Sequence, residues 1–366
     1  MLKKWIAPLA FILWIQNCET TNLEDRTTLP KYPGSALEKV IQLDRPPGNI
    51  SASSDGRIFF SFFPQGSPPI KVAELKNGQA VAFPNQAFQK NFNTVLSVRA
   101  DDKSRLWTLD YGNLGIGSGP KIYAFDIATG AVIHEYSFPS DIAPKDSLFN
   151  DMQVDTVTET IYITDTSPII PDPGLVVYDI GTKKARRLLK GHVSVTGERN
   201  EIVVNGSPFE VAGVPIIFNA DSIALDQNLE WLYFAPFTSG ELYRAKTADL
   251  RNKSLTAAQL AEKVEQYSLK TMSDGISLDL SGNIYVTDAE HSAVNLIDPN
   301  TKALTTLFKD PSFRWPDGFS YAPDGYMYLT CSALNEVFLQ TDATILSRGP
   351  YYIYRFHPEA SGIVGR

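Results

Sequence analysis

The sequence has 366 residues, of which 43% are hydrophobic and 20% charged. A disordered chain has fewer apolar residues and a higher net charge, so this composition is typical of a folded globular protein. Acidic residues outnumber basic residues by 41 to 33, which gives a formal charge of −8. A partner with a phosphate backbone needs clustered Lys and Arg, so the composition argues against nucleic-acid binding.

The N-terminal residues have the pattern of an export signal. Two lysines precede an apolar run over residues 5–15, which is shorter than the roughly 20 residues of a membrane-spanning helix. The sequence IQNC at residues 15–18 follows and resembles the processing site of bacterial lipoproteins, although Asn17 stands where Gly, Ala or Ser is usual. We expect a signal peptide over residues 1–17 and a lipid anchor on Cys18, which places the protein in the cell envelope. The alternative is ordinary secretory cleavage and a secreted protein.

The segment over residues 18–35 is polar and has no periodicity. It predicts a tether between a membrane and a globular part that extends over residues 36–366. If Cys18 carries a lipid, Cys331 is the only other cysteine and no intrachain disulfide can form. A lone cysteine is most often a small buried hydrophobic residue, and we expect this of Cys331.

One theme repeats along the remainder of the chain. A short strand that begins near a polar residue leads into a turn rich in Gly, Asp or Asn, and an aromatic-rich strand follows. Turns such as Asp324-Gly325 supply the positive φ that a tight hairpin needs. The copies begin near Gly48, Thr94, Asp151, Asp221, Asp274 and Asp317.

The spacing of the repeats indicates the fold. A second pair of strands follows each hairpin, and four strands in roughly 40 to 50 residues are the signature of a propeller blade. The sequence therefore predicts an all-β protein, a six-bladed β-propeller with four-stranded antiparallel blades. We expect the strand over residues 37–43 to close the ring beside residues 351–356. One short inserted helix is expected, from a capping box at Thr256 to about Gln266.

Polar residues recur where the first strand of a repeat begins and where the second strand ends. Both positions lie at the same face of the ring, because the two strands are antiparallel. Pockets of this fold lie at the axis, so we expect a ligand site at this mouth of the channel. A single Asp there could instead cap a turn, but several close carboxylates repel one another unless a cation or ligand lies between them. The expected site residues are Asp110, Asn150, Asp151, Asp221, Asp274, Asp288 and Asp317.

Acid–base chemistry at this mouth would need a titratable pair. Among the four histidines, only His291 lies in a loop on the same face as Asp274, so it alone is placed for proton transfer. The alternative for His291 is a loop histidine bonded to neighbouring backbone. The candidate catalytic residues are therefore Asp274, Asp317 and His291.

Several motifs resemble those of the yellow and major royal jelly protein family, whose bacterial members are described as dopachrome tautomerase-related. The resemblance extends over about residues 36–358. It implies a six-bladed propeller, an envelope or secreted location, and a small aromatic or amine-type ligand in the channel. Dopachrome-tautomerase-like isomerase activity is one of the functions that the family implies. The motifs are RLWTLD at 105–110, GLVVYD at 174–179, WLYFAP at 231–236, SDGIS at 273–277, DAEHSA at 288–293 and WPDGF at 315–319.

A second resemblance, more distant, is to propeller lactonases of the gluconolactonase type. Those enzymes hold a divalent cation at the channel mouth, and the resemblance implies Asn150, Asp221 and Asp274 as ligands of Ca²⁺ or another divalent cation. Their first-blade glutamate is replaced here by Asn49, and calcium affinity falls with the number of charged ligands. Three functions stay open: a small-molecule binder with or without isomerase activity, a calcium-dependent lactonase, and a non-catalytic surface protein that binds a macromolecule.

Overall fold

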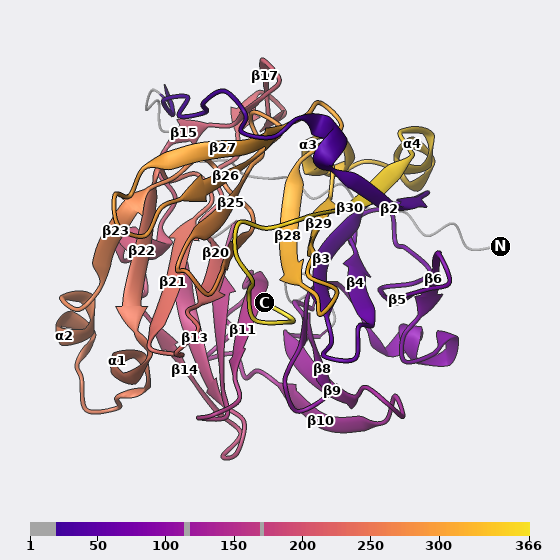
Figure 1. Cartoon of the computed structure of the whole chain (residues 1–366). Helices are drawn as coiled ribbons and strands as arrows, with labels where there is room; N and C mark the ends of the chain where they lie inside the picture. Colours follow the sequence, from indigo (N-terminus) through magenta and orange to yellow (C-terminus); the bar gives the residue numbers. More distant parts are fainter. Residues whose placement is uncertain (1–19, 113–117, 169–171) are drawn as a thin grey trace.

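The computed structural model describes residues 20–112, 118–168 and 172–366, and it confirms the propeller (Figure 1). Six four-stranded antiparallel sheets surround a central axis. The residues of the expected signal peptide and Cys18 lie outside the described residues.

Each blade is one sheet, and its first strand in the order below lies at the axis. Blades 1 to 3 are β3 (Pro47–Ala52), β4 (Ile58–Phe62), β5 (Val72–Lys76) and β6 (Gln79–Ala82); β7 (Val95–Ala100), β8 (Arg105–Asp110), β9 (Lys121–Asp126) and β10 (Val132–Ser137); and β11 (Phe149–Asp155), β12 (Thr160–Asp165), β13 (Gly174–Asp179) and β14 (Lys184–Leu188). Blades 4 to 6 are β20 (Ala220–Leu225), β21 (Trp231–Pro236), β22 (Glu241–Lys246) and β23 (Glu265–Leu269); β24 (Ile276–Leu278), β25 (Ile284–Asp288), β26 (Ala293–Ile297) and β27 (Leu304–Lys309); and β28 (Pro316–Tyr321), β29 (Met327–Cys331), β30 (Tyr351–Phe356) and β2 (Glu38–Leu43).

The ring closes by pairing the two ends of the propeller within one blade. Strand β2 pairs antiparallel with β30, with Ile41 opposite Ile353 and Leu43 opposite Tyr351. The sequence prediction for residues 37–43 is therefore confirmed. Buried side chains from neighbouring blades form the hydrophobic clusters that hold the blades together, as Ile41, Phe60 and Ile353 do between blades 6 and 1.

The helices are short and lie outside the blades. They are α1 (Thr247–Arg251), α2 (Ala257–Ala261), α3 (Leu334–Val337) and α4 (Asp342–Ser347), with 3₁₀ turns η1 (Gly34–Ala36), η2 (Gln86–Asn91) and η3 (Val193–Val195). The capping box predicted at Thr256 is present, with its side chain and that of Gln259 bonded reciprocally. The helix ends earlier than predicted, because the outer strand of blade 4 already begins at Glu265. Nothing in the hydrophobic pattern indicated α1, α3 or α4, which are only 4 to 6 residues long.

Small hairpins cover one face of the ring. The hairpins are β16 (Val203–Val204) with β17 (Ser207–Pro208) and β18 (Glu210–Val211) with β19 (Val214–Pro215), and beside them lies the pair β1 (Thr21–Asn22) and β15 (Asn200–Glu201). Strand β1 pairs with β15 in parallel, so the N-terminal segment also lies on this face.

The described part of the expected tether contacts the propeller closely. The backbone N–H groups of Lys31 and Tyr32 donate to carbonyls of β27. The Tyr32 ring packs on Phe308 at a centroid distance of 5.5 Å, and its hydroxyl donates to Glu359 over 2.7 Å. These contacts cover the outer edge of blade 5, which would otherwise expose unpaired backbone groups.

Two further expectations are met. Cys331 is free and buried, with 3% of its surface exposed. The turn glycines Gly56, Gly282 and Gly325 have φ between 83° and 85°, which a hairpin turn requires and other residues rarely adopt. Within the described ranges, no helix is long and apolar enough to cross a membrane.

Candidate functional site

The starts of the innermost strands share a local irregularity. In five blades the first strand pair shifts register at its start, for example between Phe149 and Met152, between Ala220 and Ile223, and between Pro316 and Phe319. In blade 5 the inner strand itself begins only at Ile276. A bulge inserts an extra residue and re-aims a side chain. The polar residues at these positions can therefore point along the channel rather than across the sheet.

A repeated hydroxyl group stabilises these starts. Each hydroxyl comes from the second strand of the same blade and accepts a backbone N–H at the start of the inner strand, where the regular ladder of strand hydrogen bonds is interrupted or has not begun. Asp274 N and Gly275 N donate to Thr287 Oγ1 over 3.0 and 3.1 Å. The equivalent bonds run from Asn49 to Ser61 at 3.1 Å, from Asp151 to Thr164 at 3.2 Å and from Gly318 to Thr330 at 3.0 Å. The sequence analysis missed this set, although Thr recurs one residue before Asp165, Asp288 and Cys331.

The side chains at the strand starts meet in a cavity of about 100 Å³ on the axis, the axial cavity. All six blades contribute to its lining. The polar lining residues are Asn49, Gln65, Asn150, Asp151, Thr166, Asp221, Asp274 and Asp317, and the apolar ones include Phe63, Leu96, Tyr111, Leu148, Phe218, Phe237, Leu334 and Phe338. The structure thus brings together five of the seven expected site residues and adds an aromatic wall that the sequence did not predict.

Three carboxyl groups of the axial cavity act on one another. Burial and the neighbouring carboxylates raise the pKa of Asp221 and of Asp317 well above the usual range. Burial raises the pKa of Asp274 to about 7 against the effect of a hydrogen bond from Trp315 Nε1, which is 2.7 Å from Asp274 Oδ2. Asp221 Oδ1 is buried and accepts no hydrogen bond from an N–H or hydroxyl group of the described structure; its carboxyl group interacts with that of Asp274, to which it can be hydrogen-bonded when one of the two is protonated. Such an acceptor, aimed into a cavity, is costly unless a ligand satisfies it.

The fourth carboxyl group, Asp151, has a different environment. Burial raises its pKa, and the positive charge of Arg99 opposes this rise. Asn49 Nδ2 donates to Asp151 Oδ1 over 2.9 Å, while Asn49 Oδ1 accepts the N–H of Val98 over 3.2 Å. Asp151 therefore has partners that favour its ionised form.

A buried lysine lies near the same group of carboxylates. Lys270 Nζ donates to the backbone carbonyls of Phe237, Ser239 and Thr271 over 2.7 to 3.2 Å. Burial lowers its pKa to about 7, and the charge of Asp221 acts against this change. The ammonium is held by carbonyls of blades 4 and 5 and is not part of the cavity lining.

Two of the seven expected site residues, Asp110 and Asp288, do not line the axial cavity. Asp110 accepts the backbone N–H groups of Asn93, Thr94 and Gly112. Asp288 accepts the N–H of His291 at 3.0 Å, and its carboxylate also contacts the His291 ring. The alternative that the sequence left open, a turn cap, describes these positions at the ends of second strands.

His291 faces a separate pocket on the rim. It lies between Asp288 and Asp25, whose carboxylate is 3.5 Å from Nε2. The hydrogen bond that the His291 ring donates to the Asp288 carboxylate raises the pKa of His291. Neither His291 nor Asp288 lines the axial cavity, so the expected role of His291 as an acid or base beside Asp274 and Asp317 receives no geometric support.

The expected metal ligands fit an ion poorly. Asn150, Asp221 and Asp274 all line the axial cavity. Within residues 20–112, 118–168 and 172–366, however, no group of three or more His, Cys, Asp or Glu side chains is placed to hold a metal ion. Asn49, which the resemblance places at the position of the lactonase glutamate, already accepts the backbone N–H of Val98 with its amide oxygen. Calcium takes six to eight oxygen ligands and prefers several carboxylates; the axial cavity has four carboxyl groups, but no three of them are placed to share one ion.

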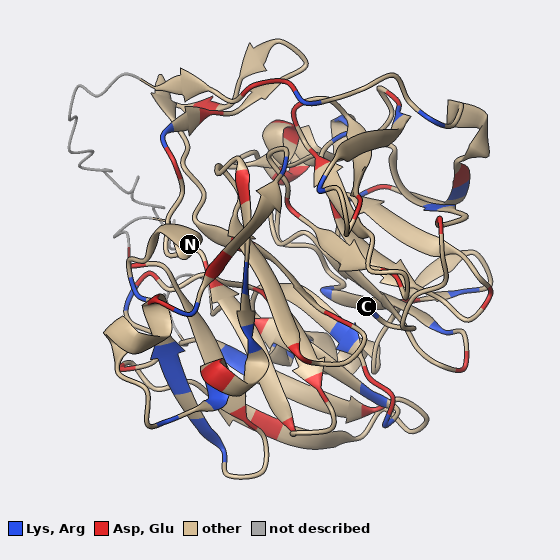
Figure 2. Ribbon diagram, turned by 60° about the vertical axis from the view of Figure 1, so that its left-hand side comes forward, with Lys and Arg blue, Asp and Glu red and all other residues tan. Residues whose placement is uncertain are grey.

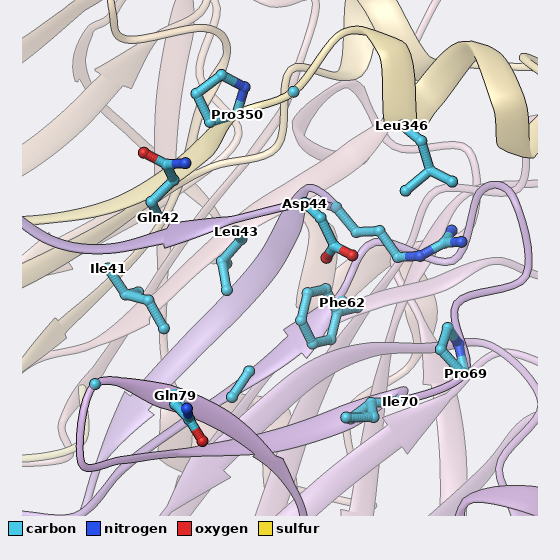
Figure 3. Close-up of a pocket in the computed structure, with 14 residues that line it drawn as sticks. Ile41, Gln42, Leu43, Asp44, Phe62, Pro69, Ile70, Gln79, Leu346 and Pro350 are labelled. Atoms are coloured by element: carbon cyan, nitrogen blue, oxygen red, sulfur yellow. The ribbon is translucent and has the colours of Figure 1, made fainter.

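A larger cavity, of about 810 Å³, lies between blades 6 and 1 (Figure 3). Its lining is mainly apolar and includes Ile41, Leu43 and Ile70. Its one cation, Arg45, is already paired with Asp342, at 2.9 Å between Nη2 and Oδ2. The larger cavity shares no residue with the axial cavity, and it gathers no converging polar groups of the kind that define a small-molecule site.

The fold and the axial cavity define the class of this protein: a six-bladed propeller with an acidic, aromatic-walled site at one mouth of its channel. The family described as "Major royal jelly protein" matches residues 93–341, which is more than half of the chain. The chain belongs to the major royal jelly protein family.

Two curated relatives agree with this assignment. Major royal jelly protein 6 of Apis mellifera is 28% identical over 156 residues, which cover 41% of this chain and 35% of the relative. Major royal jelly protein 1 of the same organism is 22% identical over 198 residues, or 50% and 44% of the two chains. The chain thus spans less than half of the length of these curated relatives.

Solved propellers share the fold at low identity. A luciferin-regenerating enzyme superposes with a TM-score of 0.58 at 12% identity, covering 90% of this chain and 97% of the other. A gluconolactonase from Xanthomonas campestris gives 0.57 at 11% identity, covering 87% and 88%. Regucalcin from Agrobacterium tumefaciens, described as a calcium-binding protein, gives 0.57 at 14% identity, covering 89% and 96%. At such identities the likeness concerns the fold alone.

Proposed function

We propose that the axial cavity binds a small organic cation, an amine whose ammonium group lies among the four carboxyl groups and whose carbon part contacts the aromatic wall. The observation that carries the proposal is the buried Asp221 Oδ1, which lines the cavity and accepts no hydrogen bond from an N–H or hydroxyl group of the described structure. An ammonium group donates up to three hydrogen bonds. It also relieves the repulsion among Asp221, Asp274 and Asp317.

The size and the wall of the cavity support an amine of modest size. About 100 Å³ exceeds the ~30 Å³ that a water molecule takes up and is below the ~150 Å³ of an apolar cavity that accommodates benzene. The ammonium and the adjoining carbons therefore fit as the cavity stands. An aromatic ring would need the cavity to widen, and Phe63 and Phe338 are among the side chains that line it. Cations are also attracted to the faces of aromatic rings.

The same carboxyl groups could support an isomerase reaction of the dopachrome type. Tautomerisation needs one group that removes a proton and a second that returns it. A pKa of about 7 lets Asp274 act in either role near neutral pH. Burial and the neighbouring carboxylates raise the pKa of Asp221 well above its usual range, which favours Asp221 as the group that returns the proton. We propose this activity as a secondary function of the same site, with dopachrome as the substrate to assay.

Calorimetric titration of the purified protein tests the binding proposal. Tyramine is expected to bind, and tyrosol, which has a hydroxyl in place of the ammonium, is expected to bind at least tenfold more weakly. Asp221→Asn should weaken tyramine by about tenfold to a hundredfold, because a charged hydrogen bond contributes about 1.5–3 kcal/mol. Asp55→Asn, in an exposed turn at the other end of β3, is the matched control and should bind as the wild type does. Equal affinity for tyramine and tyrosol would refute the proposal.

A further inference from the structure

We propose that residues 361–366 plug the channel at the end opposite the axial cavity and hold Arg99 there as a counter-charge, so that the site selects a monovalent organic cation over a divalent metal ion. The inference rests on the proposed function and specifies the charge of its ligand.

The plug crosses the centre of the ring, where its yellow trace ends in Figure 1. Its hydrogen bonds reach inner strands or adjoining turns of five blades. Its partners are Ser51 of β3, Arg99 of β7, Asp226 after β20, Leu280 after β24 and Tyr321 of β28, over 2.8 to 3.0 Å. The plug is therefore an integral part of the channel and not a loose tail.

Gly365 is the residue that lets the plug enter. Its φ is +88°, and a Cβ atom at this position would lie 2.5 Å from Ala100 O and 3.0 Å from Ala52 O. Only glycine combines this backbone conformation with so close an approach to two inner strands. Its carbonyl accepts Ser51 Oγ over 2.8 Å and Arg99 Nη1 over 3.0 Å.

Arg99 connects the plug to the axial cavity. Its side chain is buried, with 4% of the residue exposed, and its Nε has no hydrogen-bond partner in the described structure. Its charge acts on Asp151 at the cavity and on Arg366 in the plug. A buried guanidinium with one carbonyl partner is expensive unless an anion compensates it, and Asp151 is that anion.

The positive charge of Arg99 thus lies on the plug side of Asp151, whereas Arg366 faces Asp102, Asp155 and Asp226, which compensate its charge. Coulomb energy scales with the product of the charges, so Arg99 repels a divalent ion twice as strongly as an ammonium group at the same place. The carboxyl groups attract a divalent ion twice as strongly by the same rule, and the charge of Arg99 reduces that advantage in favour of the single charge. The poor fit of the axial cavity to calcium, described above, also disfavours a divalent ion.

The test compares tyramine with Ca²⁺ in calorimetric titrations of the whole protein at one pH and ionic strength. Arg99→Met removes the charge and retains an unbranched apolar side chain, and Arg99→Lys retains the charge. Gly365→Ala displaces the plug without touching the cavity. Gly325→Ala is its matched control, since Gly325 has φ +85° and no atom within 4 Å of an added Cβ.

We expect Arg99→Met to raise the affinity for Ca²⁺ relative to tyramine at least tenfold, and Gly365→Ala to shift the ratio in the same direction. Arg99→Lys and Gly325→Ala should keep the wild-type ratio. A wild-type protein that binds tyramine, with an unchanged ratio in Arg99→Met and Gly365→Ala, would overturn this inference and leave the proposed function intact. Micromolar Ca²⁺ binding by the wild type would also overturn it. If the wild type binds neither ligand, the proposed function itself fails and the inference with it.

Discussion

At the scale of single residues, the axial cavity combines four carboxyl groups whose environments differ. Asp221 and Asp317 are held toward the neutral form by burial and by neighbouring carboxylates. Burial raises the pKa of Asp151 too, but Arg99 and a hydrogen bond from Asn49 act against this rise. Asp274 lies between these cases, and its pKa of about 7 makes it the group that titrates near neutral pH. Groups with shifted pKa values that converge on a cavity are typical of functional sites.

Binding of an amine should therefore depend on the protonation of Asp274. A cation favours the ionised carboxylate, so tyramine affinity should rise with pH through about 7 and should fall by up to about tenfold per pH unit below it. In Trp315→Phe the carboxylate loses a hydrogen bond that lowers its pKa, so the midpoint should move to higher pH. Titrations between pH 5.5 and 8.5 measure the midpoint. Trp231→Phe alters a ring beside Arg244 and should leave the midpoint unchanged. If the midpoint moves in this variant too, the shift in Trp315→Phe is not specific to the hydrogen bond with Asp274.

The same shift affects stability. The pKa of Asp274 is about 7 in the folded protein and about 3.9 in an unfolded chain. The folded state thus binds more protons between these values, and its stability should fall as the pH rises from about 4 to 7. Asp274→Asn removes this loss and should stabilise the protein by roughly 1–3 kcal/mol at pH 8, with little effect at pH 4.5. Thermal unfolding at both pH values measures the difference. An equal change at both would show that charge is not the cause.

At the scale of elements, much of the propeller could be predicted and the direction of its side chains could not. The repeat of polar residue, turn and aromatic strand predicted six blades, and β2 closes the ring as expected. The positions of Asp151, Asp221 and Asp317 in the cavity depend on bulges, and one extra residue changes where a side chain points without altering the repeat.

At the ends of the second strands the polar side chains do not point into the axial cavity, because no bulge re-aims them there. Asp110 and Asp288 recur with the spacing of the cavity residues, yet no bulge turns them toward the axis and they cap turns instead. The aromatic wall was not predictable either. Tyr111, Phe218 and Phe338 come from connections between strands or blades, where sequence periodicity carries no information about packing.

The hydroxyl groups that accept N–H groups at the strand starts should matter for stability. Thr287→Val leaves the backbone N–H groups of Asp274 and Gly275 without their acceptor. An unsatisfied buried donor costs about 1–3 kcal/mol, so we expect a lower denaturation midpoint by a comparable amount. Thr305→Val, at an exposed position of β27, is the matched control and should change the midpoint little. Comparable losses in both variants would contradict a specific role of the Thr287 hydroxyl.

The N-terminal segment should behave as part of blade 5. Tyr32→Ala removes the ring contact with Phe308 and the hydrogen bond to Glu359, and we expect it to destabilise the protein by about 1–3 kcal/mol. Hydrogen exchange of β27 should become faster, because the segment covers that edge. Leu29→Ala should have no effect, because 91% of the surface of Leu29 is exposed to solvent. A tether without structural role would leave both variants like the wild type.

At the scale of the whole molecule, acidic and basic segments are interspersed around the ring (Figure 2). The N-terminal segment lies on the face that holds the axial cavity. Leu23 packs against a cluster that contains Phe237 and Leu334, and both of these residues line the cavity. An anchor at Cys18 would attach the propeller by this face. The plug closes the other end of the channel, so a ligand would enter from the side of the anchor.

We propose on the sequence of residues 1–18 that the protein is held in the cell envelope through Cys18. Produced in a bacterium that processes lipoproteins, the wild type should partition into the detergent phase, with an intact mass that exceeds the chain from Cys18 by a lipid group. Cys18→Ser should appear in the aqueous phase and should bind tyramine as the wild type does, because the axial cavity is built from residues 48–338. A wild type that is found in the aqueous phase with the mass of an unmodified cleaved chain would instead establish secretion. In that case the orientation argued from Leu23 loses its basis, whereas the selectivity of the plugged channel, which depends on Arg99, Gly365 and the carboxyl groups of the axial cavity, does not.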